Sequence, residues 1–227
     1  MRILIVDNTI DRECWGSPEL QRFAVTVPGA TVTVRRGPES DLPKDISNFD
    51  RIVLSGSKTS AMENAPWISR LEDLIRCALS EGKPFLGVCY GHQMLARTLG
   101  GKEFVRQSVS AEFGWCRIEQ LADSPLFHGL PRVFYSFSSH YDEVSVLPSG
   151  TELLACSEQC AIQAIQVKGH PVFGIQFHPE KDLEGGTQTL AECQKKGKPK
   201  KLLHPNEGMK LFQPEVGEIL FRNFFNL

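Results

Sequence analysis

A cysteine at the junction of a predicted strand and a predicted helix is the first candidate for chemistry. The apolar run 84–88 is typical of a buried parallel strand, and 93–99 has the apolar spacing of a helix. Between them, residues 87–91 (Gly-Val-Cys-Tyr-Gly) have the G-x-C-x-G pattern of a nucleophile elbow, in which glycines permit a tight turn. A helix N-terminus favours a thiolate, and its free N–H groups can stabilise an oxyanion. We therefore expect Cys89 to be a nucleophile.

A histidine and a glutamate supply the groups that such a nucleophile needs. Residues 171–177 predict a strand that ends in His178-Pro-Glu180. The proline favours an extended backbone, in which residues two apart project on the same side, so the two side chains can lie together. An imidazole can move a proton to and from a thiol while a carboxylate orients the ring. The sequence thus predicts a Cys-His-Glu triad, with His92, three residues after Cys89, as the rival base.

A loop of small residues is the candidate for the rest of an oxyanion hole. Residues 55–60 (Ser-Gly-Ser-Lys-Thr-Ser) follow the predicted strand 50–54. If this strand lies beside the cysteine strand, backbone N–H groups at Gly56 and Ser57 face the thiol. Such loops are also common as plain turns, so the prediction of an oxyanion hole rests on the position of this loop at the end of a strand.

The surrounding elements predict an α/β fold with a doubly wound, mostly parallel sheet flanked by helices, of the flavodoxin-like kind. The remaining strands predict a smaller antiparallel section. The expected parallel strands are 3–6, 30–35, 50–54 and 84–88, and the expected helices are 18–25, 66–79, 93–99 and 216–225. The other expected strands are 103–106, 114–119, 132–138, 151–156, 161–167 and 171–177.

Length and composition restrict the function classes. A chain of 227 residues with 41% hydrophobic residues predicts a single domain over 1–227 with one sizeable core. The net charge of -2 gives no basic footprint for nucleic acid, and no apolar run is long enough to span a membrane. The strand-like start leaves no room for a leader, so we expect a cytoplasmic protein. The seven scattered cysteines indicate neither a metal site nor a disulfide framework, and no spacing implies an organic cofactor.

Taken together, four motifs resemble class I glutamine amidotransferases over nearly the whole chain. They are the elbow 87–93, the loop 54–57, the segment 139–144 (Ser-His-Tyr-Asp-Glu-Val) and the strand end 176–180 (Gln-Phe-His-Pro-Glu). The third motif, with 157–164 behind it, is similar to the glutaminase part of GMP synthetases.

The resemblance implies a cysteine-dependent glutaminase of the class I amidotransferase fold. Cys89 would attack the side-chain amide of L-glutamine and form a γ-glutamyl thioester that water hydrolyses, with His178 moving protons and Glu180 orienting it. The backbone of Tyr90, with Gly56 and Ser57, would hold the oxyanion. The resemblance further implies substrate-binding roles for Gln93, Ser139 and His140, and a separate synthetase as the acceptor of the ammonia.

Two departures from the family pattern leave alternatives open. Many relatives have Gly-Gly-Pro where this chain has Gly-Ser-Lys at 56–58, and the Ser-Gly-Ser form looks like that of free-standing γ-glutamyl peptidases, which hydrolyse γ-glutamyl conjugates. The segment from about 182 to 212 is longer than expected and is interpreted as a lid, a docking loop or a decoration. Its lysines at 195–201 indicate a solvated loop or a docking patch for an acidic partner or a nucleotide. A catalytically silent regulatory protein is the third alternative.

Overall fold

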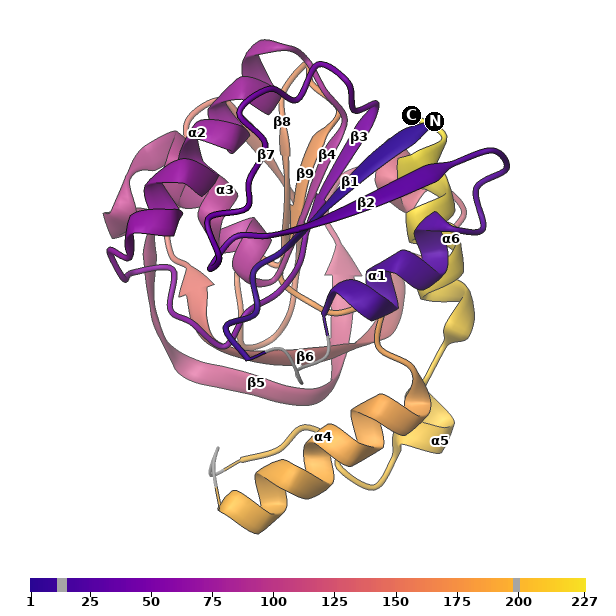
Figure 1. Cartoon of the computed structure of the whole chain (residues 1–227). Helices are drawn as coiled ribbons and strands as arrows, with labels where there is room; N and C mark the ends of the chain where they lie inside the picture. The colour runs from indigo at the N-terminus through magenta and orange to yellow at the C-terminus, as the bar shows by residue number, and fades with distance from the viewer. Residues whose placement is uncertain (12–15, 198–200) are drawn as a thin grey trace.

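The sheet that carries the site is mixed. The computed structural model describes residues 1–11, 16–197 and 201–227, and in this part nine strands form one sheet in the order β2-β1-β3-β4-β9-β8-β7-β5-β6 (Figure 1). Strands β2, β1, β3, β4 and β9 are parallel neighbours, and β8, β7, β5 and β6 continue the sheet with antiparallel pairings. This confirms the predicted α/β class with its antiparallel section. The strands are β1 Arg2–Asp7, β2 Thr31–Arg36, β3 Arg51–Leu54, β4 Phe85–Val88, β5 Val105–Gln120, β6 Val133–Val144, β7 Thr151–Cys156, β8 Ala164–Val167 and β9 Val172–Ile175.

Helices cover both faces of the parallel strands, as Figure 1 shows. On β1, Ile3 and Ile5 pack in the cluster that includes α1 and α6, whereas Leu4 and Val6 pack in the cluster that includes α2 and α3. Because successive side chains of a strand point to opposite faces, an all-apolar strand requires cover on both. The helices are α1 Ser17–Ala24, α2 Pro66–Ser80, α3 Tyr90–Gly100, α4 Leu183–Lys196, α5 Gly208–Leu211 and α6 Pro214–Phe225, with short 3₁₀ turns at Lys102–Phe104 and Pro125–Phe127.

The largest difference from the sequence prediction is in β5. The strands predicted at 103–106 and 114–119 are one strand of 16 residues that begins after the 3₁₀ turn. Its pairing with β6 shifts register between Gln107 and Glu112. Such a bulge breaks the alternation of side chains on which strand prediction depends, so the residues between the two predicted strands read as a loop.

The segment 182–212 forms two helices rather than an open loop. In Figure 1, α4 and α5 lie beyond the curled strands β5 and β6, at one end of the molecule. A small core of Trp115, Phe137 and Leu190 holds α4, with Phe212 packed against it. The chain returns along β5, where Leu203 N–H donates to Phe113 O at 2.7 Å. Residues 198–200 of the predicted lysine patch lie outside the described residues.

The segment immediately before α4 is fastened to α1. Arg22 Nη2 donates to the backbone oxygen of Glu180 at 3.1 Å, and its Nη1 lies 3.1 Å from Asp182 Oδ2. Asp182 in turn caps α4 by accepting a hydrogen bond from Gly185 N–H. Arg22 therefore connects α1 to both ends of the stretch 180–182.

None of the helices in the described residues is long and apolar enough to cross a membrane.

Trp115→Ala is expected to loosen α4 specifically. The change deletes the largest side chain of the core beneath this helix and lowers the free energy of unfolding by about 3 to 5 kcal/mol. Hydrogen exchange followed by mass spectrometry should show faster exchange in peptides from 183–196. Trp67→Ala, which empties the core under α2, is the control and should leave exchange in α4 unchanged; equal exchange in α4 of wild type and Trp115→Ala would contradict the assignment.

Candidate active site

Cys89 lies at a strained corner between β4 and α3. It is the N-cap of α3, with φ 51° and ψ -100°, and its side chain is buried. A positive φ is uncommon for a residue with a side chain and is held only by the surrounding structure. The flanking glycines permit this, since a Cβ on Gly87 would lie 2.4 Å from the backbone of Gly91, and a Cβ on Gly91 would lie 2.8 Å from Leu54 O. The predicted elbow is therefore present, with the thiol at a helix N-terminus.

His178 and Glu180 form the predicted pair directly after β9. His178 Nδ1 lies 2.6 Å from Glu180 Oε1, and each side chain is 1% exposed. The backbone N–H of His178 donates to Phe137 O on β6 at 2.7 Å, which fixes the histidine against the neighbouring strand. The spacing argument from the proline-containing tripeptide thus gave the correct contact.

The charges of its neighbours determine the protonation of His178. Burial by itself lowers the pKa of this ring, but the Glu180 carboxylate, followed by the charge and hydrogen bond of Cys89, raises it from 6.5 to about 10. The ring is thus stabilised as an imidazolium between a carboxylate and the sulfur. An imidazolium in this place is a proton donor for a leaving group.

The loop after β3 reaches the same point because β3 and β4 are neighbours. A Cβ on Gly56 would lie 2.9 Å from His178 Cε1 and 3.5 Å from Cys89 Cβ, so only glycine fits there without displacement. Asn8, at the end of β1, holds the loop by two hydrogen bonds of 2.9 Å to Ser55. Ser57 is the next residue after Gly56, and its hydroxyl accepts from Thr59 N–H at 3.1 Å. Tyr90 begins α3, where backbone N–H groups have no partner within the helix.

The three residues expected to bind substrate lie around Cys89 in different ways. The backbone oxygen of Ser139 is 3.9 Å from Cys89 Sγ. Gln93 is buried and its Nε2 donates to Asp142 O at 2.8 Å and to Gln176 Oε1 at 3.1 Å. The ring nitrogens of His140 contact Glu112 and Asp142. The side chains of Gln93 and His140 therefore bind protein groups here, whereas the backbone oxygen of Ser139 lies near the thiol.

His92 is not in a position to act as the base. It is completely buried on the face of α3 toward β9, where a Cβ on Gly174 would lie 2.5 Å from its Nδ1. Burial lowers its pKa to about 3. The ring is neutral and part of the core.

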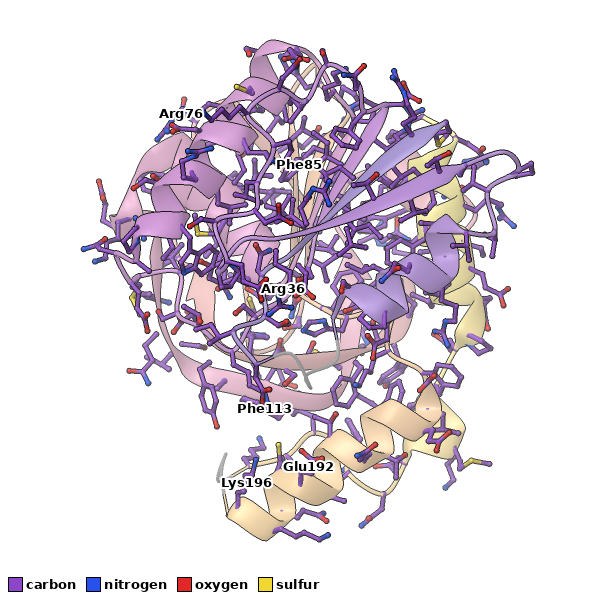
Figure 2. All side chains as sticks on the ribbon, viewed as in Figure 1. Arg36, Arg76, Phe85, Phe113, Glu192 and Lys196 are labelled. Atoms are coloured by element: carbon purple, nitrogen blue, oxygen red, sulfur yellow. The ribbon has the colours of Figure 1, made fainter. Side chains whose placement is uncertain are left out.

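Sequence reasoning missed the elements that border the site from outside. The helix α4 packs through Leu190 on Trp115 of β5 and Phe137 of β6, and Phe137 O also accepts from the backbone N–H of His178. Figure 2 shows Phe113 on β5 at the end of the molecule where Glu192 and Lys196 of α4 lie. Sequence reasoning also missed the carboxylate of Glu112. Within the described ranges, no group of three or more histidine, cysteine or acidic side chains could hold a metal ion.

Glu180→Gln is expected to lower the pKa of His178 by about one to three pH units, because an opposite charge in contact is removed. In wild type the folded-state pKa lies above the ordinary 6.5. The charged ring therefore stabilises the fold fully below about pH 6.5, and this contribution disappears as the pH rises toward the folded value. An NMR titration of the His178 ring measures the midpoint directly.

Glu207→Gln is the matched control for this titration, since it removes an exposed carboxylate from a different histidine pair. It should leave the His178 midpoint where it is in wild type. An unchanged midpoint in Glu180→Gln would show that the contact does not control the ring.

Comparisons with known proteins identify the family of the chain. Residues 21–195 match the family model described as glutamine amidotransferase class-I. The chain is 45% identical over 97 residues to one subunit of the glutamine-hydrolysing GMP synthase of Thermococcus kodakarensis, which is 43% of this chain and 50% of that protein. It is 34% identical over 143 residues to the corresponding GMP synthase subunit of Methanococcus maripaludis, covering 63% of this chain and 75% of that one. The match to the Thermococcus protein thus spans about half of its length.

Solved structures show the same fold. A glutamine amidotransferase of Thermotoga maritima superposes with a TM-score of 0.79 at 23% identity, covering 99% of this chain and 96% of that one. One from Methylobacillus flagellatus gives 0.78 at 24% identity, with 99% and 94% covered. By its sequence motifs, the match to the family model and this fold, the chain belongs to the class I glutamine amidotransferases.

Proposed function

We propose that this protein is a cysteine-dependent hydrolase that releases ammonia and glutamate from L-glutamine. The observation that carries the proposal is the meeting of three groups at the carboxyl edge of the sheet. The buried pair of His178 and Glu180 lies near Cys89, because a Cβ on Gly56 would lie 2.9 Å from His178 Cε1 and 3.5 Å from Cys89 Cβ. Membership of the family supports glutamine as the substrate.

In the first half of the reaction, Cys89 acts as nucleophile. Its thiolate attacks the side-chain amide carbon of glutamine, and the C–S bond forms as the carbonyl oxygen takes the negative charge. Backbone N–H groups of Tyr90 and Ser57, with Gly56 leaving room beside them, stabilise this oxyanion. The His178 imidazolium gives its proton to the leaving nitrogen, so the C–N bond breaks and ammonia departs.

In the second half, water hydrolyses the γ-glutamyl thioester. The now neutral His178 takes a proton from water, and the hydroxide attacks the thioester carbon. Collapse of the intermediate breaks the C–S bond, which releases glutamate and restores the thiolate beside the imidazolium. Glu180 keeps the proton on Nδ1 and the orientation of the His178 ring throughout. Ser139, Gln93 and His140 complete the glutamine site, the last two by supporting the backbone of 139–142.

A separate synthetase polypeptide is proposed as the acceptor of the ammonia, with neither nucleic acid nor a membrane as a partner. The supporting observation is that the relatives from Thermococcus and Methanococcus are individual subunits of glutamine-hydrolysing GMP synthases. We further propose a single domain over 1–227 and a cytoplasmic location, which the six free cysteines of the described residues support.

A second candidate is a free-standing hydrolase of γ-glutamyl conjugates. Ser57 and Lys58 replace the Gly-Pro of many relatives in the oxyanion loop. The α4 segment packs on β5 and β6, and β6 carries Ser139 near the thiol, so this segment is the proposed contact for a larger leaving group. The chemistry at Cys89 is the same for both substrates.

The purified protein alone is expected to release ammonia from glutamine slowly and to prefer glutamine over a γ-glutamyl dipeptide. The measurement is ammonia and glutamate release with both substrates side by side. Faster turnover of the dipeptide would assign the second candidate instead. Release from neither, with Cys89 also unreactive toward a diazo-ketone analogue of glutamine, would leave a catalytically silent protein.

Substitutions in the triad should rank in a fixed order. Cys89→Ala is expected to lower kcat by more than about a thousandfold, because the change removes the nucleophile. His178→Ala should be nearly as severe, and Glu180→Gln milder because the imidazole remains. Circular dichroism of each variant checks the fold, and an active Cys89→Ala would disprove the mechanism.

A further inference from the structure

A buried carboxylate near the candidate site is contacted by four polar side chains. Glu112 lies at the bulge of β5 and is completely buried. Its Oε1 accepts from Ser157 Oγ at 2.6 Å and from Cys116 Sγ at 3.1 Å. Its Oε2 accepts from Gln163 Nε2 at 2.5 Å and lies 2.9 Å from His140 Nε2. Burial raises the pKa of Glu112, but the His140 contact and the other donors outweigh it and hold the pKa below its usual range.

The ring of His140 connects this carboxylate to the active-site backbone. Its Nδ1 lies 3.0 Å from Asp142 O, and its Nε2 faces Glu112. The ring thus bridges the Glu112 carboxylate and the backbone oxygen of Asp142, both of which are acceptor groups. Removal of either side of this bridge leaves a buried polar group without its partner, which is costly.

The backbone that His140 holds passes next to the nucleophile. Asp142 O accepts a second hydrogen bond from Gln93 Nε2, and Asp142 Oδ2 accepts one from Ser60 Oγ at 2.5 Å. Three residues earlier in the same strand, Ser139 O is 3.9 Å from Cys89 Sγ. The position of 139–142 relative to the thiol thus depends on contacts from β5, α3 and the oxyanion loop.

We propose that Glu112 is a positioning residue for the glutamine site: through His140 it holds the backbone of 139–142 at the distance from Cys89 that substrate binding requires. The inference rests on the proposed function and adds a residue to it. Glu112 touches neither the thiol nor His178, so its effect is on where substrate sits and not on the reactivity of the sulfur.

Glu112→Gln is the sharpest test because it keeps the shape and removes the charge. Four donors converge on two acceptor oxygens, and glutamine offers only one, so His140 or Gln163 loses its acceptor. We expect KM for glutamine to rise about 10- to 100-fold, with kcat changed less than about threefold. Glu112→Asp, which keeps the charge, should recover part of the loss.

Alkylation of Cys89 separates positioning from general damage. A diazo-ketone analogue of glutamine must occupy the substrate site, whereas iodoacetamide needs only the thiol. Glu112→Gln should slow labelling by the analogue by the same factor as KM while leaving labelling by iodoacetamide at the wild-type rate. A variant that is merely unfolded would change both rates, and Cys89→Ala gives the background.

Glu143→Gln is the matched control. Glu143 is also buried in the β5–β6 pair, but its partners are Arg106 and Ser108, away from the thiol. It should leave KM and both labelling rates unchanged. Equal effects of Glu112→Gln and Glu143→Gln would overturn the proposal.

A second variant keeps the test decisive if Glu112→Gln does not fold. His140→Ala breaks the same chain of contacts one step closer to the thiol, so it should also raise KM and slow the analogue selectively. Where both variants fold, their effects on KM should not add, because they act in series. Unchanged KM in His140→Ala would overturn the proposal. Failure of the wild type to react with the analogue would instead count against the proposed function.

Discussion

The turn at Cys89 is the constraint on which the other parts of the site depend. A residue with a side chain is held at positive φ because β4 runs into α3 with no spacer, and the helix must start where its backbone nearly touches Leu54 of β3. That closeness places the oxyanion loop, which continues β3, beside the sulfur. It also directs the helix N-terminus at the thiol. A single backbone geometry therefore supplies the nucleophile, its electrostatic support and one wall of the site.

The antiparallel half of the sheet completes what the parallel half begins. Parallel strands deliver Cys89, Gly56 and His178 to one edge, as the ends of adjacent parallel strands do. The strand β6 forms the other side of the site. Its Phe137 O accepts from the backbone N–H of His178, and its Ser139 O lies near the thiol. Glu112, at the bulge of β5, and His140 of β6 hold this part of β6 in position. The site is thus built from two sheet sections of different character, joined at β9 and β8.

The sequence could predict those parts of the fold and site whose signals are local. Cys89, His178 and Glu180 each stand at a strand end with a glycine or proline that restricts the backbone, and the contact between the last two follows from their spacing. Glu112 has no such signal, because three of its four donors come from β6 and from the connection between β7 and β8, far away along the chain. The helix α4 was missed since its stability depends on Trp115 and Phe137 of other strands. The side chains of Gln93 and His140 contact the backbone oxygen of Asp142, and no local pattern in the sequence predicts such contacts.

Arg22 of α1 contacts the chain at the point where the triad ends and the α4 segment begins. Glu180 is the last residue of the triad, and the α4 segment begins after Asp182. Arg22 donates to the backbone oxygen of Glu180 and to the carboxylate of Asp182, which caps α4. The contact between Arg22 and the backbone oxygen of Glu180 involves no residue after Asp182. It is therefore independent of the length of the segment that follows, and a longer or shorter segment leaves this attachment of the triad to α1 in place.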